Sequence, residues 1–200
     1  MPPEVRAARP HDRDAVVRLL YLSAAGMYDR YAGDREAALR LLGRAFAREG
    51  TNASAEIVCV AEAGGRVAGA LAGFPIREGA RRGSAFLRLT LASLPPWRWP
   101  AALRLYRLGA RVTPPAPPAC FYVDGLATDP GLRRSGAARA LLDAAEARAR
   151  LLAQPALALD TALDNAPARA LYESFGFSAA GEVAPSYGLP GFVGYVKRLA

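Results

Sequence analysis

Residues 126–142, Leu126-Ala-Thr-Asp-Pro-Gly-Leu-Arg-Arg-Ser-Gly-Ala-Ala-Arg-Ala-Leu-Leu142, combine the end of a strand, a basic turn and the start of a helix. Pro130 interrupts the strand pattern, and Gly136 allows the backbone to approach a bound group closely. The residues that follow are strong helix formers. A helix N-terminus exposes free N–H groups, and three arginines surround this one: Arg133, Arg134 and Arg139. The turn therefore predicts an anion site, and we expect its ligand to carry a diphosphate.

The composition predicts a globular protein. The chain has 200 residues and is 52% hydrophobic, which is enough for one domain with a substantial core. No apolar run is long enough to span a membrane, and the first residues lack the apolar segment of a secretory signal. We therefore expect a cytoplasmic protein. The net charge is +8, but the arginines are spread along the whole chain. This pattern favours a solvated basic surface over a nucleic-acid-binding face.

The cysteines and the histidine argue against several kinds of site. Cys59 and Cys120 both lie in apolar, strand-like runs, so we expect buried free thiols rather than a disulfide or a catalytic thiol. The single histidine, His11, lies in a polar run. Without a group of His and Cys residues, no metal site is expected. A Ser-His-Asp triad has no supporting motif either.

The spacing of apolar residues predicts an alternation of strands and helices. In chain order, we expect a strand over 4–9, helices over 12–27 and 34–48, a hairpin of strands 57–62 and 66–74, a strand over 120–128, a helix ending near 152, a strand over 155–160, a helix over 165–174 and a strand over 191–199. A turn is expected at Gly181.

Residues 77–118 are the least regular part and are interpreted as a helical, proline-rich insertion packed onto the main sheet. Arg81-Arg82-Gly83 predicts a polar break, residues 87–94 have helical character, and Pro100 suits the first turn of a helix over 100–111. Three roles remain open for this insertion: a substrate lid or pocket wall, a subunit interface, and a membrane-surface helix. The last is suggested by Trp97 and Trp99 among arginines.

A second motif follows the basic turn, Asn165-Ala-Pro-Ala-Arg-Ala-Leu-Tyr172-Glu-Ser-Phe-Gly176-Phe177. This block, together with Arg133-x-x-Gly136-x-Ala138 before it, resembles two blocks of the GNAT superfamily of N-acetyltransferases, the acyl-CoA pyrophosphate loop and the Asn…Leu-Tyr-Glu-x-x-Gly-Phe segment. The close match covers residues 120–182, and the earlier helices and hairpin agree in order only.

The resemblance implies an α/β (α+β) fold of the GNAT type. Its centre would be a mixed, mostly antiparallel twisted sheet, splayed between two central strands and flanked by helices. We expect a single domain over residues 1–200, with the helical insertion near 77–118. The protein would be a monomer or a homodimer.

The resemblance also implies that acetyl-CoA is the co-substrate. The backbone of the splayed strand would pair with the pantetheine arm as a sheet edge does, and the diphosphate would lie on the N–H groups of the turn. A side chain larger than methyl at Ala138 would crowd it. The positions that the resemblance assigns to acyl-CoA binding are Leu126, Ala127, Thr128, Arg133, Arg134, Ser135, Gly136, Ala137, Ala138, Arg139 and Asn165.

Tyr172 is the family's candidate proton donor for the leaving thiolate. A phenol has a pKa of about 10, above that of a thiol, and therefore stays protonated at neutral pH. Asn165 lies seven residues earlier, so both are expected to project from one helix face. The alternative interpretation of Tyr172 is a core aromatic residue beside Phe175 and Phe177.

The general base is chosen among three carboxylates on strand-like runs: Asp124, Glu62 and Asp160. Asp124 is the preferred base, because it lies two residues before the segment expected to bind pantetheine. A carboxylate paired with an arginine at the end of the sheet is the alternative interpretation. Tyr28 and Tyr31 follow the first helix, where the family often builds a wall of the acceptor site.

The resemblance thus predicts transfer of an acetyl group from acetyl-CoA to a primary amine of a small molecule or a peptide. Transfer would be direct, in a ternary complex and through a tetrahedral intermediate whose oxyanion accepts a hydrogen bond from the Leu126 N–H. A non-catalytic acyl-CoA-binding sensor or partner module is the main alternative, and a basic nucleic-acid-binding domain is a second. A Rossmann enzyme is disfavoured because the Gly-x-Gly-x-x-Gly spacing is absent. The acceptor stays open among small amines, amino acids, aminoglycoside-like antibiotics and protein N-termini.

Overall fold

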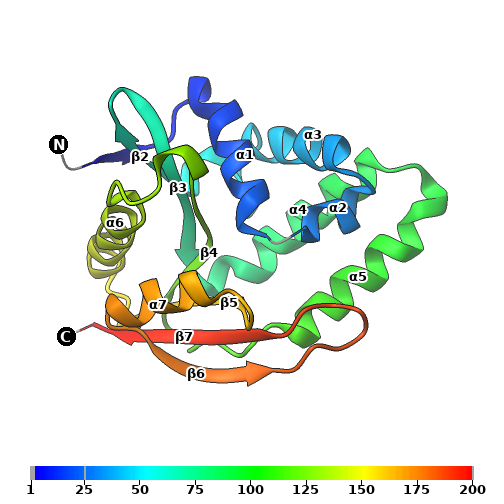
Figure 1. Cartoon of the computed structure of the whole chain (residues 1–200). Coiled ribbons are helices and arrows are strands. Elements are labelled where there is room, and N and C mark those ends of the chain that lie inside the picture. The colour runs from blue at the N-terminus through cyan, green and yellow to red at the C-terminus, as the bar shows by residue number, and fades with distance from the viewer. Residues whose placement is uncertain (1–2, 25, 200) are drawn as a thin grey trace.

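A mixed sheet forms the centre of the computed structural model, which describes residues 3–24 and 26–199 (Figure 1). Within these residues, seven strands pair in the order β1-β2-β3-β4-β5-β7-β6. They are β1 (Glu4–Ala7), β2 (Val58–Ala63), β3 (Arg66–Pro75), β4 (Phe121–Thr128), β5 (Ala156–Ala162), β6 (Ser178–Val183) and β7 (Phe192–Arg198). Only β4 and β5 pair in parallel, and all the other neighbours are antiparallel. The prediction of a mixed, mostly antiparallel sheet is confirmed.

The two central strands separate after a short parallel segment. Their paired positions are Phe121 with Leu157, Tyr122 with Ala158, and Val123 with Leu159. Beyond Val123, β4 continues in pairing with β3 as far as Thr128, while β5 continues with β7. Figure 1 shows the result, with β4 following β3 and β5 following β7 in diverging directions. The predicted splay is therefore present.

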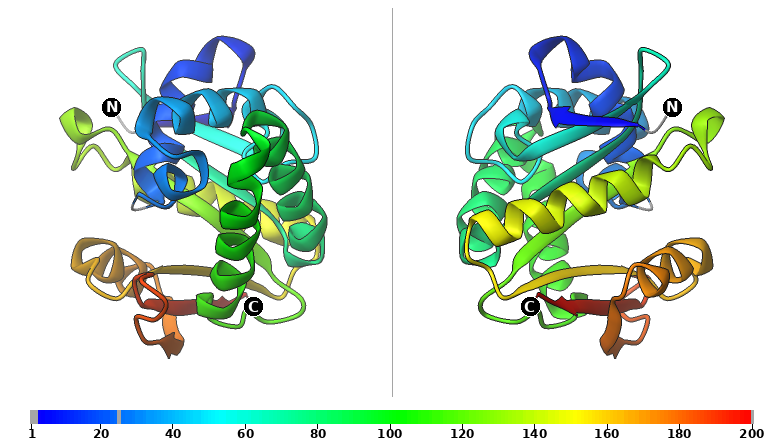
Figure 2. Two further views of the ribbon diagram at one scale, coloured as in Figure 1. Left: turned by 90° about the vertical axis from the view of Figure 1, so that its right-hand side faces the viewer. Right: turned by 90° about the vertical axis from the view of Figure 1, so that its left-hand side faces the viewer.

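Helices cover both faces of the sheet (Figure 2). On one face, α1 packs against α3, β3 and β4, and on the other face α6 packs across β2, β3 and β4. Residues alternate between these faces along each strand: Ala70 of β3 is buried with α1 and α3, whereas Leu71 is buried with α6. The helices are α1 (Arg13–Ser23), α2 (Met27–Ala32), α3 (Arg35–Phe46), α4 (Gly79–Ser93), α5 (Trp99–Val112), α6 (Ala137–Leu151) and α7 (Ala166–Ser174).

Local sequence signals explain most of the element boundaries. The Asp34 side chain accepts a hydrogen bond from the Ala37 N–H and so caps α3, as expected from its position. Gly64 and Gly65 both have positive φ, which is the requirement of a tight two-residue hairpin turn between β2 and β3. At Gly73, a Cβ atom would lie 2.5 Å from the Phe121 ring, beside an irregularity in the β3–β4 register. Glycine is therefore needed there for a close approach of strand and ring.

The segment 77–118 differs from its prediction in one respect. The expected polar break at Arg81-Arg82-Gly83 is wrong, because α4 runs through it from Gly79 to Ser93. Arg82 is buried there and forms ion pairs with Glu56 and Glu78, both at 2.7 Å, so the charge that suggested a break is satisfied inside the helix. The segment contacts both the sheet and other helices. Phe86 and Leu89 of α4 are buried in one cluster with Val60 of β2, while α4 also packs against α3, and α5 packs against α2 and α4.

Two further boundaries depart from the predictions. The first helix ends at Ser23, and a separate short helix, α2, begins at Met27. The turn expected at Gly181 lies inside β6, where the pairing with β7 shifts between Ala179 and Gly181. The exposed, small-residue sequence of β6 carries no alternation of apolar and polar residues that would have indicated a strand. No helix within the described residues is both long enough and apolar enough to cross a membrane.

Candidate active site

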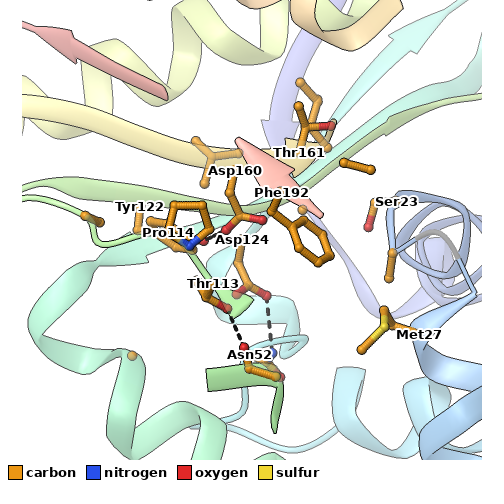
Figure 3. A pocket seen from close by; sticks show the side chains of 18 of the residues that line it. Ser23, Met27, Asn52, Thr113, Pro114, Tyr122, Asp124, Asp160, Thr161 and Phe192 are labelled. Atoms are coloured by element: carbon orange, nitrogen blue, oxygen red, sulfur yellow. Dashed lines mark hydrogen bonds between the residues drawn. The ribbon is translucent and has the colours of Figure 1, made fainter. Parts of the chain in front are cut away.

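A cavity of about 720 Å³ lies where β4 and β5 diverge. Its floor comes from the strand residues just beyond the last parallel pair, 124–126 of β4 and 160–162 of β5. Residues of α1, α2, α4, α5 and α7 line its walls, and Figure 3 shows Asp124 and Asp160 among the side chains around it. The cavity therefore joins the segment expected to bind acyl-CoA to the region of 77–118, which lines it as a wall.

Asp124 and Asp160 face this cavity from equivalent positions on the two strands. Each is the first residue after the last parallel pair, Val123 with Leu159. The Asn52 amide Nδ2 donates a hydrogen bond of 3.2 Å to Asp124, and the Tyr122 hydroxyl donates a short one to Asp160. Both carboxylates therefore lie beside the cavity at the point where the strands diverge.

The environment of Asp124 suits a proton acceptor at neutral pH. The surrounding protein raises its pKa to about 7, chiefly through loss of hydration and secondly through the negative charge of Asp160, while the bond from Asn52 opposes the shift. The side chain stays accessible from the cavity, so enclosure by protein and access for a ligand coexist at this carboxylate. Burial raises the pKa of Asp160 as well.

Of the three carboxylates considered as base, Glu62 lies outside the cavity. It is on β2 and forms an ion pair of 2.7 Å with Arg6, which keeps its pKa below the usual range. This is the arginine-paired carboxylate that formed the alternative interpretation, at Glu62 rather than at Asp124. The geometry leaves Asp124 and Asp160 as the carboxylates beside the diverging strands.

Tyr172 is a core aromatic residue that also lines the cavity, and its role as proton donor stays a prediction. Its side chain is only 6% exposed, and its ring packs at 5.9 Å, centroid to centroid, against both Phe177 and Tyr195. The residue also lines the cavity. Burial, and secondly the charge of Asp160, raise its pKa above the ordinary value, so the phenol holds its proton at neutral pH.

Asn165 lies at the cavity for a reason different from the expected one. It is the N-cap of α7 rather than a residue within the helix, and its side chain accepts a hydrogen bond from the Ala168 N–H. Its amide Nδ2 also donates a hydrogen bond of 3.1 Å to the Thr161 hydroxyl. Asn165 and Tyr172 both line the cavity, but the argument from their helical spacing does not apply.

Leu126, Ala127 and Thr128 form the free end of β4. All three pair with β3 on one side, and within the described residues no strand pairs with their other edge. Leu126 also lines the cavity. An extended ligand arm could therefore add to this edge as a further strand would.

The turn between β4 and α6 has a constrained backbone. Gly136 has a φ of 84° and caps the N-terminus of α6, and Arg134 has a φ of 62°. A Cβ atom at Gly136 would meet nothing closer than 3.8 Å. The backbone conformation therefore favours glycine here, and the close approach of a bound group to Gly136 stays a prediction.

The turn leaves several donors suited to an anion. The N–H groups of Ala137, Ala138 and Arg139 open α6, while the next N–H, at Ala140, is bonded to the Gly136 carbonyl. The Ser135 hydroxyl is buried and has no hydrogen-bond partner among the described residues. A hydroxyl without an acceptor beside a free helix N-terminus fits the oxygens of a diphosphate.

The arginines of the turn have different surroundings. The Arg139 guanidinium lies 5.5 Å above the centre of the Phe175 ring, a cation–π contact that directs it toward α7. Arg133 and Arg134 are exposed. Ala137 is buried in the core, so its backbone N–H is the group it could offer a ligand.

Several residues that line the cavity belong to no recognisable sequence motif. Tyr122 was detectable, because it lies two residues before Asp124 and therefore on the same face of β4. Asn52 and Tyr106 come from a loop and a helix distant in sequence, and nothing in their neighbourhoods indicates a site. Tyr31 lines the cavity, as predicted for an acceptor wall, whereas the Tyr28 ring packs edge-on against Phe86.

Comparison with protein families decides the classification. The model of the acetyltransferase (GNAT) family matches residues 24–177. The chain belongs to the GNAT acetyltransferase family. Acetyl-CoA is the general co-substrate of this family, which agrees with the anion-binding turn and the free strand edge. The search among curated proteins finds no match for this chain.

Solved structures of acetyltransferases share the fold. An acetyltransferase crystal structure superposes with a TM-score of 0.71 at 22% identity, covering 98% of this chain and 100% of the other. An N-acetyltransferase from Staphylococcus aureus Mu50 superposes with a TM-score of 0.72 at 19% identity, covering 96% of this chain and 99% of the other. The polyamine N-acetyltransferase of Drosophila melanogaster superposes with a TM-score of 0.58 at 16% identity, covering 98% of this chain and 100% of the other. At these identities the likeness concerns the fold alone.

Proposed function

We propose that this protein is an N-acetyltransferase that moves the acetyl group of acetyl-CoA directly to the primary amine of a small molecule or peptide. One observation carries the proposal: Asp124 and Tyr172 line the same cavity, at the point where the central strands diverge. One is a carboxylate with a pKa near neutrality, and the other is a phenol that keeps its proton. These are the two proton-transfer groups that amide formation from a thioester requires.

Acetyl-CoA would be held mainly by backbone groups. The free edge of β4 at 126–128 would pair with the pantetheine arm, and the diphosphate would accept from the N–H groups at the start of α6 and from the Ser135 hydroxyl. Asn165 could bind the same arm through the second hydrogen of its amide. Bound in this way, the thioester would lie near residues 124–126, and the Leu126 N–H would stabilise the oxyanion.

Asp124 would act as the general base. It accepts a proton from the bound amine, so that the nitrogen lone pair can form the new C–N bond. Its raised pKa matters in both directions: a carboxylate with an ordinary pKa is too weak a base, and one with a higher pKa would be protonated at pH 7.

Tyr172 would act as the general acid. It donates its phenolic proton to sulfur as the C–S bond breaks, so that CoA leaves as a thiol. The burial that holds the proton on Tyr172 also disfavours a free thiolate in the same place, which keeps the transfer favourable. The nitrogen of the tetrahedral intermediate gives its second excess proton to the Tyr172 phenolate as the amide forms, which restores the phenol, and exchange with solvent after product release removes the proton from Asp124.

Tyr172→Phe tests this assignment. The variant keeps the ring that packs against Phe177 and Tyr195 and removes only the hydroxyl. We expect kcat in a CoA-release assay with a panel of amines to fall about 100-fold or more, while calorimetry gives an unchanged affinity for acetyl-CoA. Tyr187→Phe, at an exposed position, is the matched control and should behave as wild type. Equal turnover of wild type and Tyr172→Phe would remove Tyr172 as the acid.

The same two measurements separate an enzyme from a binding module. A sensor or partner module that uses the fold without catalysis would bind acetyl-CoA in the calorimeter and release no CoA with any amine. The proposal requires both binding and release.

A further inference from the structure

The charges that line the cavity are opposite to those of the chain as a whole. The sequence has 26 Lys and Arg residues against 18 Asp and Glu, and a net charge of +8. Among the described residues that line the cavity, none is Lys or Arg, and the charged ones are Asp124 and Asp160. A random sample of this surface would have included several arginines, so the lining is chemically distinct.

The helix α5 shows how the arginines are kept out. Tyr106 and Gly109 of this helix line the cavity together with Ala110, at a spacing of three and four residues that marks one helical face. The arginines of α5 are exposed on the other side: Arg104, Arg107 and Arg111. The one buried arginine near the cavity, Arg82, has its guanidinium occupied by Glu56 and Glu78.

Small residues and aromatic rings shape the wall opposite α7. A Cβ atom at Gly109 would lie 3.3 Å from the Tyr31 hydroxyl, and one at Gly83 would lie 3.3 Å from the Tyr106 hydroxyl. The two glycines thus let tyrosine hydroxyls rest against helix backbones. Phe74 and Phe192 line the cavity as well. The wall suits an apolar or aromatic body.

The side-chain donors that contact Asp124 and Asp160 each serve one carboxylate. The Tyr122 hydroxyl is bonded to Asp160, and the Asn52 Nδ2 to Asp124. The Oδ1 atom of Asn52 is buried beside Asp124 without a partner among the described residues. An ammonium group carries three donors and no acceptor, and it complements this set.

We propose that the acceptor is an alkyl or arylalkyl primary amine whose body carries no carboxylate or phosphate, and that the cavity rejects α-amino acids. The inference rests on the proposed function for the site and deepens it. A carboxylate attached to the acceptor would enter beside Asp124 and Asp160 with no cation to pair with, and would lose its hydration there. The ammonium group of a simple amine meets only attraction.

Three probes that share the 2-phenylethylamine core test the proposal. They are 2-phenylethylamine, L-phenylalanine and L-phenylalaninamide, the last of which adds bulk at the same carbon without charge. With CoA-saturated protein at pH about 8, where Asp124 is ionised, we expect the simple amine to bind at least about 10-fold more tightly than the amino acid in calorimetry. The affinity for L-phenylalaninamide should be close to that for 2-phenylethylamine. Amino-acid binding as tight as that of the amine would overturn the inference.

A charge placed in the cavity provides a second test. Ala110 lines the cavity at an exposed position of α5, and Ala101 is exposed on the same helix outside it. Ala110→Arg should lower the amine-to-amino-acid preference about 10-fold, whereas Ala101→Arg, with the same added charge, should leave it unchanged. An identical preference in both variants would contradict the inference.

Binding and turnover together distinguish a failure of the proposed function from a failure of the proposed selectivity. Preferential binding of 2-phenylethylamine without CoA release from acetyl-CoA would contradict the proposed function and support the selectivity. Acetylation of phenylalanine as fast as 2-phenylethylamine would support the proposed function and overturn the selectivity.

Discussion

The two sides of the cavity are built from different kinds of chemical group. On one side the strand residues 124–126 of β4 line the cavity, and the same continuous stretch runs on through the strand edge to the N-terminus of α6. The opposite side is lined by residues from parts of the chain that are distant in sequence: the end of α1, the loop holding Asn52, and the helices α2, α4 and α5. Backbone recognition leaves a compact motif in the sequence, whereas side-chain recognition across distant elements leaves none. The chain therefore reveals its acyl donor more readily than its acceptor.

Asp124→Asn should have the largest effect on activity, because Asp124 lies where the two sides meet. Loss of the base should reduce kcat by about 100- to 10,000-fold. Acetyl-CoA affinity should be unchanged, since the backbone side remains intact. Steady-state CoA release together with calorimetry measures both quantities. Asp143→Asn, an exposed carboxylate on α6, is the control and should keep full turnover.

Arg82→Met should damage the side-chain half selectively. Arg82 is 6% exposed and joins α4 to the loop that carries Asn52, through bonds to Glu56, Glu78 and the Thr51 carbonyl. Removing one member of a buried ion-pair network costs about 3 kcal/mol of unfolding free energy, measurable by urea denaturation.

The kinetic consequence of Arg82→Met sharpens the comparison between the two sides. The KM for the amine should rise while the KM for acetyl-CoA stays constant. Arg81→Met is the matched control, because Arg81 is exposed and its ion pair with Glu78, at 3.7 Å, is longer than that of Arg82. Equal rises in both KM values would show that the two sides are not independent.

Gly136→Ala should damage the backbone half. The φ of 84° costs an alanine about 1 kcal/mol, so the turn should relax and its N–H groups should move. We expect the KM for acetyl-CoA to rise about 10-fold with little change in the KM for the amine. Gly188→Ala carries the same strain, at a φ of 74° and with open space around it, and should affect neither KM.

The smallest expected effect is on stability. The pKa of Asp124 is about 7 in the folded protein and about 3.9 in an unfolded chain, so the folded state binds more protons between these values. Stability therefore falls as the pH rises from about 4 to about 7. Asp124→Asn should be more stable than wild type at pH about 8, by on the order of 1 kcal/mol after solvent screening, and about equal at pH 4. Thermal unfolding at both pH values measures the difference.

The fold and the backbone side of the site were largely predictable, because local patterns encode them. Asp34 as a cap, the Gly64-Gly65 turn and the helix after Gly136 all have short-range physical causes. The helix through Arg82 was not predictable, since its polar residues are satisfied by Glu56, which is distant in sequence. Tyr31 was predicted as a wall residue, but Tyr106 was not, because the two tyrosines come together only after α5 packs against α2.

The pH dependence of kcat/KM tests most directly whether acetyl transfer takes place at the strand divergence with Asp124 as base. We predict that kcat/KM of the wild type rises about 10-fold per pH unit below pH about 7 and then levels, because Asp124 must lose its proton to act. In Asp124→Asn, the inflection near pH 7 should be absent, although Asp160, Tyr122 and Asn52 remain around the position. An inflection that persists unchanged in Asp124→Asn would contradict the account.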